Sequence, residues 1–415
     1  MLAHCEILLG RLVSDNARVG FGTTILDDVS KFGQQKGGGA TSEPPFVAIG
    51  WRGNRHFQTI WPNRIERDPT GVQLASWSES VIFKSEDGDS LRVRWSRHRD
   101  DPSSDDNRTD SDSTDHNADH GLRQPNPRPV LIVLHGLAGC ADSNNVMATA
   151  AKGYALGFDI VRVDLRNTQA DDTPSLGVGH AGRSEDLRAT VRHIEEREPG
   201  APITVVAFSL GGNITLKALG EYGENLPKDL RAAATISVPI DLGNACAAID
   251  ERRENWIYRR YFLKRLAHRY RNAQQQRPDL FHDIDLDSIR GISDWDNAVV
   301  VPLGGFADAE EYYTLNSSLK VLTDIRVPTL LVQAQDDPII PFESFQTPAV
   351  QDHNFVRLLA PRQGGHVGFY STMTLESEPD RYWAENRALA FCAKAVGLGW
   401  GNRSRTLPTV ATDAN

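Results

Sequence analysis

The segment at positions 203–213, ITVVAFSLGGN, surrounds a serine with residues that could make it a nucleophile. A β-branched run leads into Ser209, and small residues stand two positions before and after it, at Ala207 and Gly211. This pattern is typical of a nucleophile elbow, a sharp strand-to-helix turn whose flanking positions must be small because neighbouring chains pass close by. The motif is A-x-S-x-G rather than G-x-S-x-G, and the alternative interpretation is an ordinary serine that caps a helix.

A serine hydroxyl becomes nucleophilic when a base takes its proton and an acid orients that base. Asp336 and Asp337 directly follow a strand-like run, and His366 lies further on in a Gly-rich loop. The order serine, acid, histidine is that of α/β-hydrolases. We therefore predict a catalytic triad of Ser209, Asp337 and His366. Asp337 is preferred because it begins the spacing D-x-x-I-P, and Asp336 stays open as the alternative.

A transition-state oxyanion needs two hydrogen-bond donors near the serine. The sequence HGLAG at 135–139 follows an apolar run, where the loop with the second donor belongs. We predict that the backbone N–H groups of Leu137 and Leu210 form this oxyanion hole. The mechanism requires no metal and no organic cofactor.

Two other kinds of site are rejected from the sequence. Residues 177–182 match G-x-G-x-x-G, but the polar TQADDTPSL precedes them where a dinucleotide-binding motif requires a strand. Four cysteines are too few and too widely spaced for a disulfide framework or a CxxC metal site; they are Cys5, Cys140, Cys246 and Cys392.

Alternating apolar runs and amphipathic stretches must position these residues. Strands are predicted at 130–135, 158–164, 203–208, 233–239 and 329–334, and helices at 143–156, 183–197 and 211–222. Alternation of nearly continuous apolar strands with helices indicates the α/β class, a doubly wound and mostly parallel sheet. Residues 241–326 are too long for a simple connection, so we expect a helical cap or lid inserted after the strand near 233–239.

Composition sets the outer limits of the core. Residues 100–129 hold eight Asp and three Arg with few large apolar side chains, which predicts a disordered acidic insertion. Residues 1–45 are interpreted as an N-terminal extension and 400–415 as a tail. The hydrolase-like core would then comprise residues 46–240 and 327–399.

The overall composition also excludes several classes of protein. The chain has 415 residues, 40% of them hydrophobic, and a net charge of −10, which argues against a nucleic-acid binder. No apolar run approaches the roughly 20 residues that span a bilayer. The first residues lack the basic region of a signal peptide, so we expect a cytoplasmic protein. The oligomeric state is not indicated.

Several motifs together resemble the YheT-like α/β-hydrolases, which include animal ABHD relatives. They are HGLAG, DLRN, HAGRSEDL, AFSLGGN and AQDDPIIP in the core, GNRHFQTIWP upstream, and SDWDNAV and GFADAEEYYTLNSS in the cap. The resemblance spans roughly 50–395 and implies hydrolysis of carboxylic esters, with short-chain esters, acylglycerols and phospholipids as substrate classes. Ala207 departs from the family's usual glycine, and Asn167-Thr168 from its usual Gly-Cys or Gly-Ser pair.

Residues 251–277 suggest a second hypothesis. They contain nine basic and two acidic residues, interleaved with aromatic side chains. Such a segment could make peripheral contact with an anionic membrane; the alternative is a cap helix with its apolar side on the core and its basic side in water. Three functions are thus weighed: a serine esterase with a small ester or lipid substrate, a membrane-surface acylglycerol lipase or phospholipase, and a non-catalytic hydrolase-like binding protein.

Overall fold

A computed structural model describes residues 44–399, apart from 49, 66, 68, 73, 75–77, 99–126 and 169–176. Nearly all of the predicted N-terminal extension, acidic insertion and C-terminal tail lie outside the described residues. The described residues include most of the predicted core and the whole range 241–326 of the predicted cap.

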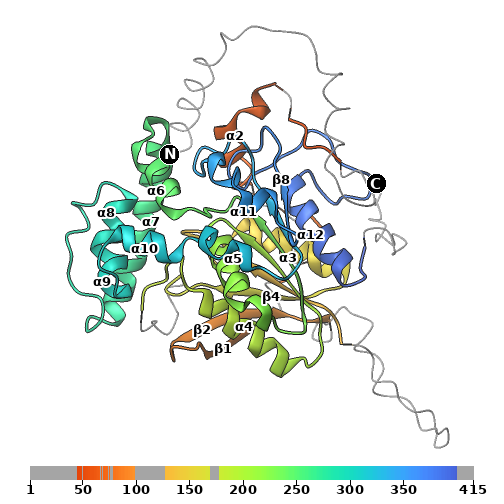
Figure 1. Cartoon of the computed structure of the whole chain (residues 1–415), viewed down its shortest axis with the longest axis horizontal. Helices are drawn as coiled ribbons and strands as arrows, with labels where there is room; N and C mark the ends of the chain where they lie inside the picture. Colours follow the sequence, from red (N-terminus) through yellow and green to blue (C-terminus); the bar gives the residue numbers. More distant parts are fainter. Residues whose placement is uncertain are drawn as a thin grey trace, which may run out of the picture.

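The centre of the molecule is a mixed sheet of eight strands in the order β1-β2-β4-β3-β5-β6-β7-β8 (Figure 1). β2 runs antiparallel to both of its neighbours, and the strands from β4 to β8 run parallel. The doubly wound, mostly parallel sheet expected from the sequence is thereby confirmed. The strands are β1 Glu79–Lys84, β2 Ser90–Ser96, β3 Val130–Leu134, β4 Asp159–Asp164, β5 Ile203–Phe208, β6 Leu230–Ile236, β7 Thr329–Val332 and β8 Val356–Leu359.

Helices cover both faces of this sheet. Alternate side chains of β3 show the two layers, because Ile132 belongs to one apolar cluster and Val133 to the other. α4 (Ser184–Arg197) and α5 (Leu210–Tyr222) pack on the first face, and α3 (Asn144–Leu156) and α12 (Trp383–Ala395) on the second. Every residue of β3, β4, β5 and β7 is consequently buried, which explains their nearly unbroken apolar sequences.

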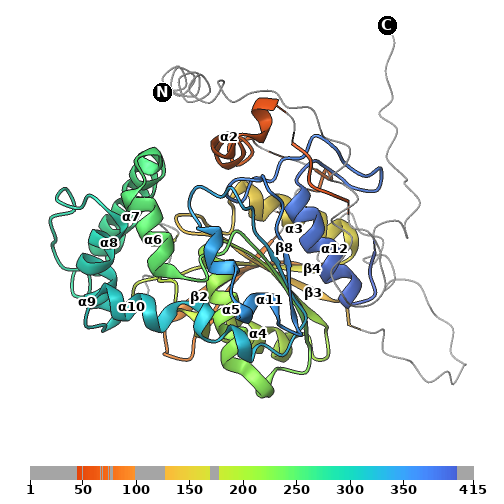
Figure 2. The same cartoon turned by 45° about the horizontal axis from the view of Figure 1, so that its top comes forward.

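The long connection between β6 and β7 carries a set of helices on one flank of the sheet (Figure 2). It comprises α6 Leu242–Glu251, α7 Trp256–Gln276, α8 Ile292–Trp295, the π-helical turn η8 Asp296–Val300, α9 Val301–Gly304 and α10 Ala309–Asn316. We refer to residues 241–326 as the cap. An apolar cluster built largely from cap residues, with Phe281, Trp295 and Val299 among them, packs these helices together.

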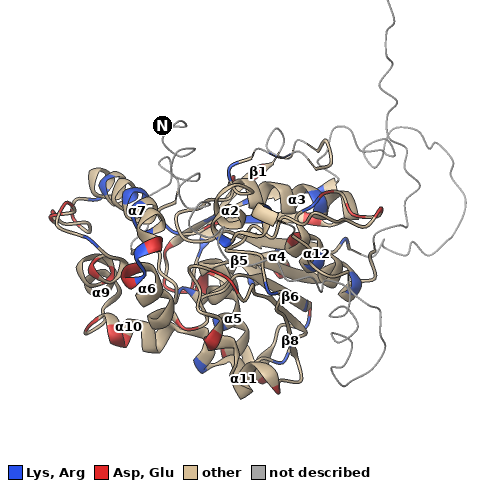
Figure 3. Ribbon diagram, turned by 90° about the horizontal axis from the view of Figure 1, so that it is seen from above, with Lys and Arg blue, Asp and Glu red and all other residues tan. Residues whose placement is uncertain are grey.

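α7 is the longest helix of the cap and is largely exposed. Only Tyr258, Tyr270 and Ala273 of its 21 residues are buried. Its arginines and its one lysine lie along much of its length (Figure 3). Within the described ranges, none of the helices combines the length and apolarity needed to cross a membrane.

A short helix precedes the sheet. α2 (Arg55–Ile60) follows the 3-10 turn η2 (Gly50–Gly53), and Asn54 caps it by accepting from the backbone N–H groups of His56 and Phe57. Four of its six residues are buried although the helix lies outside the sheet. Contacts with the loop after β8 account for that burial, as described below.

Candidate active site

Ser209 occupies the turn between β5 and α5 in a strained conformation. Its backbone has φ 49° and ψ −119°, which a residue with a side chain rarely adopts. The Ser209 N–H donates to the carbonyl of Ile236 at 2.9 Å, which ties the turn to β6. A Cβ atom at Gly211 would lie 2.4 Å from the carbonyl oxygen of His135, so only glycine fits there. The local geometry is that of an elbow held by tertiary contacts.

The structure brings Ser209, His366 and Asp337 into one hydrogen-bonded chain. Nε2 of His366 lies 3.1 Å from Oγ of Ser209, and Nδ1 lies 2.9 Å from Oδ2 of Asp337. Because the carboxylate only accepts, Nδ1 carries the proton and Nε2 is left to accept from the serine hydroxyl. This is the tautomer that lets an imidazole act as the base for a serine.

The surroundings of Asp337 explain the D-x-x-I-P spacing. Oδ1 accepts from the backbone N–H groups of Ile339 and Ile340, at 2.8 and 3.0 Å. Oδ2 accepts from the side-chain amide of Gln333 as well as from His366. Four donors therefore fix the carboxylate, which is only 3% exposed.

Asp336 takes another position. Its Oδ1 accepts from the backbone N–H of Gly365 at 3.0 Å, beside the histidine rather than on its ring. Burial raises the pKa of Asp336 to about 6, and the neighbouring Asp337 carboxylate adds to this effect. Of the two aspartates, Asp337 meets the imidazole and Asp336 braces the loop that carries it.

The loop after β3 packs against Ser209. A Cβ atom at Gly136 would lie 3.0 Å from Cβ of Ser209. Leu137 and Leu210 line the same pocket beside it, and neither backbone N–H has an intramolecular acceptor among the described residues. Both amides are thus free to donate, as an oxyanion hole requires.

His135 holds this loop after β3 in place. Its Nδ1–H donates to the carbonyl of Gly136 at 2.8 Å, and its Nε2 accepts from the backbone N–H of Leu165 at 3.2 Å. Complete burial lowers the pKa of His135 to about 3, so the ring stays neutral. This role was not predicted, because the sequence marks His135 only as part of a common His-Gly turn.

Two arginines of α7 hold the loop from the cap side. Arg265 donates to the carbonyl of Ala138 at 3.2 Å, and Arg269 donates to the carbonyl of Gly139 at 2.5 Å. Burial lowers the pKa of Arg269 to about 10, which leaves it charged at neutral pH. The basic cap segment therefore contacts the active-site loop as well as solvent, which neither sequence interpretation anticipated.

The histidine loop is held by α2, more than 300 residues upstream. The backbone N–H of His366 donates to Oγ1 of Thr59 at 2.9 Å. The amide of Gln58 exchanges two hydrogen bonds with the backbone of Tyr370, at 2.6 and 3.0 Å. At Gly368 a Cβ atom would lie 1.7 Å from the carbonyl oxygen of Gln58, so helix and loop backbones touch. The upstream motif GNRHFQTIWP was the only sequence signal for these residues.

A pocket extends from the predicted oxyanion amides between the core and the cap. Part of its wall is apolar and consists of Leu210, Ile214, Leu266, Tyr270 and Trp295. The rest of the wall includes polar residues. In the portion of the chain that is described, no cluster of histidine, cysteine or carboxylate side chains could hold a metal ion.

Comparisons with known proteins agree with this fold. The model of the family described as "alpha/beta hydrolase fold" matches residues 129–371, more than half of the chain. "Putative esterase YheT" of Escherichia coli (strain K12) is 26% identical over 84% of this chain and 92% of its own length. "Phospholipase ABHD3" of Mus musculus is 28% identical over 58% of each chain. "Monoacylglycerol lipase" of Saccharomyces cerevisiae is 29% identical over 61% of this chain and 57% of its own. The resemblance to YheT-like proteins is thus confirmed, and the chain belongs to the α/β-hydrolase fold family.

Proposed function

We propose that this protein is a serine hydrolase of carboxylic esters. Ser209 attacks the acyl carbonyl while Nε2 of His366 takes the hydroxyl proton, and Asp337 orients the ring and stabilises the imidazolium. The Leu137 and Leu210 amides hold the oxyanion of the tetrahedral intermediate. The imidazolium protonates the leaving alcohol, and water then attacks the acyl-enzyme with His366 again as base, releasing the acid.

The observation that carries this proposal is the hydrogen-bonded chain Ser209–His366–Asp337 with the strained serine at its end. Backbone strain of this kind costs of order 1–3 kcal/mol and persists where function requires the conformation. The relatives are named as esterases and lipases, which supports an ester or lipid substrate. A non-catalytic binding protein would not need a histidine in this tautomer beside a strained serine.

The test is labelling with a fluorophosphonate probe, which reacts with activated serines. We expect the wild type to be labelled and Ser209→Ala to be unlabelled, with ester hydrolysis reduced at least about 10⁴-fold. Ser288→Ala is the matched control, because Ser288 is an exposed serine of the cap that should label like the wild type. An unlabelled wild type, or equal labelling of Ser209→Ala, contradicts the proposal.

A second candidate is an acylglycerol lipase or phospholipase that works at a membrane surface. Four aromatic residues form what we call the aromatic edge: Trp51, Trp61, Trp256 and Tyr261, which are 45–58% exposed. Trp51 lies in η2, and Trp61 is the C-cap residue of α2. Trp256 and Tyr261 lie in α7. The two helices meet where Nδ1 of His56 lies 2.8 Å from the Tyr258 hydroxyl. Exposed tryptophan and tyrosine beside basic residues suit a lipid interface.

A further inference from the structure

The motif HAGR, at 180–183, forms a turn that is fixed from both the core and the cap. The Ala181 N–H donates to the hydroxyl of Tyr312 on α10 at 3.1 Å. The Ala181 carbonyl accepts from the side chain of Asn213 on α5 at 2.9 Å. A Cβ atom at Gly182 would lie 1.7 Å from Oδ1 of Asn316, so this position must be glycine. The turn is therefore held rigidly between the nucleophile helix and the cap.

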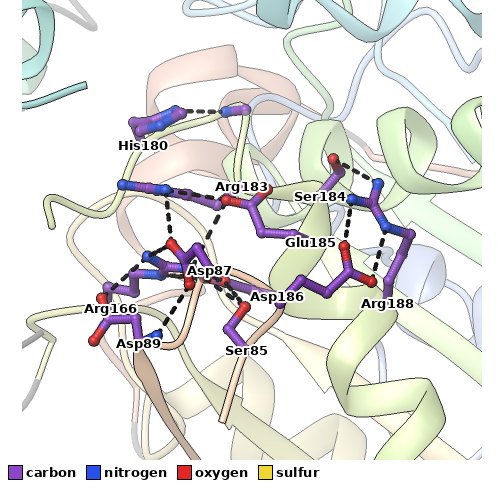
Figure 4. A network of polar contacts seen from close by, with 12 residues as sticks. Ser85, Asp87, Asp89, Arg166, His180, Arg183, Ser184, Glu185, Asp186 and Arg188 are labelled. Carbon is purple, nitrogen blue, oxygen red and sulfur yellow. Dashed lines mark hydrogen bonds and ion pairs between the residues drawn. The ribbon is translucent and has the colours of Figure 1, made fainter. Parts of the chain in front are cut away.

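A buried ion-pair network supports the same turn from below (Figure 4). Arg166 contacts Asp87, Asp89 and Asp186, and thereby joins the β1–β2 turn to the loop after β4 and to α4. A Cβ atom at Gly179 would lie 2.8 Å from the Arg166 carbonyl oxygen. The backbone on both sides of His180 is thus fixed, which leaves the imidazole little freedom to move.

The His180 ring is neutral and presents one free N–H group. Its Nδ1 accepts from the Gly182 N–H at 3.0 Å, so the proton resides on Nε2, at the other side of the ring. The side chain is buried, with 8% of the residue exposed. Burial lowers the pKa of His180 well below its ordinary value, and the charges of Arg183, Arg166 and Lys217 act in the same direction. The ring remains an uncharged donor at neutral pH.

His180 lines the pocket that begins at Leu137 and Leu210. The rings of Phe306 and Tyr312 pack nearly perpendicular to the His180 ring, with centroids 5.5 and 5.6 Å away. Among the described residues the His180 side chain makes no hydrogen bond besides the one at Nδ1. An N–H group without a protein partner can donate to an acceptor oxygen of a bound ligand.

We propose that His180 is a substrate-binding residue that donates its Nε2–H to an oxygen of the bound ester other than the scissile carbonyl. The preferred substrates would then carry a second acceptor oxygen, as an ether, hydroxyl or further ester, in the acyl or the alcohol part. That the ligand is an ester rests on the proposed function. The presence of the donor and of the pocket that His180 lines does not depend on the proposed function.

Two substitutions separate the two nitrogens of the ring. His180→Asn keeps an oxygen near Nδ1 for the Gly182 N–H and removes the donor at Nε2. His180→Gln places an amide N–H near the position of Nε2. Both variants must retain the wild-type melting temperature, so that a change in substrate preference is not a folding defect.

The probes are two pairs of esters that differ only by an oxygen in place of a methylene group. The first pair is 4-nitrophenyl hexanoate and 4-nitrophenyl 3-ethoxypropanoate, which tests the acyl side. The second is pentyl butyrate and 2-ethoxyethyl butyrate, which tests the alcohol side. In one pair we expect His180→Asn to lower kcat/KM for the oxygen-bearing ester about tenfold relative to its partner, and His180→Gln to restore much of the ratio. Unchanged ratios in both pairs would overturn the proposal.

The same pairs are titrated into the Ser209→Ala protein with and without His180→Asn, and Kd is measured by calorimetry or NMR. This binding measurement does not depend on hydrolysis. A preference for the oxygen-bearing ester that disappears with His180→Asn supports the role of His180, even if the wild type hydrolyses no ester. Equal Kd values for the two esters of each pair, unchanged by His180→Asn, refute it even if the wild type is an active esterase.

Discussion

At the scale of single residues, the two adjacent aspartates after β7 show how local backbone decides a chemical role. Asp337 is followed by a turn whose amides at Ile339 and Ile340 point at its carboxylate, which leaves its other oxygen for His366. Asp336 faces the Gly365 amide instead. Residue type alone does not distinguish them, but the turn after Asp337 does.

This difference predicts unequal effects of removing each carboxylate. Asp337→Asn should lower kcat for a simple ester such as 4-nitrophenyl butyrate by about 10⁴-fold, because an amide no longer stabilises the productive tautomer and the imidazolium. Asp336→Asn should lower it less than about tenfold, because the amide oxygen can still accept from Gly365. Steady-state kinetics on variants of matched melting temperature measure both. A larger loss for Asp336→Asn would reverse the assignment.

At the scale of elements, α2 contributes more to the site than its six residues suggest. It lies outside the sheet, yet Thr59 accepts from the backbone of His366 and Gln58 binds the backbone of Tyr370. Val367 and Phe369 in the same loop have positive φ values of 69° and 41°. Such a loop needs outside support to hold the imidazole over Ser209.

The contact predicts that Thr59 positions His366. Thr59→Val removes the acceptor without changing the size of the side chain, and we expect it to lower kcat and the rate of fluorophosphonate labelling about tenfold with little change in KM. Thr59→Ser, which keeps the hydroxyl, should recover most of the rate. Thr190→Val is the control, because Thr190 makes the same bond to the carbonyl four residues earlier, in α4. A rate loss in the control equal to that in Thr59→Val would make the effect structural.

The sequence predicts those elements whose burial leaves a pattern in consecutive residues. β3, β4 and β5 are buried on both faces and read as apolar runs, so their strands were predicted nearly to the residue. β1 and β8 lie at the sheet edges with exposed residues in their patterns, and α12 carries no distinctive signal, so none of the three was predicted. Within the site, the order of serine, acid and histidine was readable from sequence.

The supporting residues were not readable because their partners are distant in the chain. Thr59 and His366 are 307 positions apart, and Arg269 and Gly139 are 130 apart. Periodicity and spacing report contacts within an element, whereas these bonds exist only after the sheet has brought its loops together. The upstream and HAGR motifs marked the right segments without indicating what their side chains contact.

At the scale of the whole molecule, the basic segment noted in the sequence forms the cap helix α7. The basic residues of α7 differ in their contacts. Arg265 and Arg269 donate to the loop after β3, and Arg259 donates to the carbonyl of Ile249. The exposed group comprises Arg260, Lys264 and Arg271, and Arg265 is exposed as well. The exposed group lies on the helix that also carries Trp256 and Tyr261 of the aromatic edge. The cap therefore joins an outer surface with basic and aromatic side chains to the loop that holds Leu137, one of the two predicted oxyanion donors.

If that surface meets a membrane, both charge and aromatic burial should contribute. We expect the protein to sediment with vesicles that contain phosphatidylglycerol, less with phosphatidylcholine alone, and to dissociate as salt shortens the Debye length. Trp256→Ser with Tyr261→Ser should weaken binding at least about tenfold, since burying one large apolar side chain contributes about 1.5–3 kcal/mol. Leu315→Ser is the control, because Leu315 is 58% exposed on another cap helix. Absence of vesicle binding, or equal weakening by the control, would leave the basic face of α7 as a solvated surface and the esterase acting on dissolved substrates.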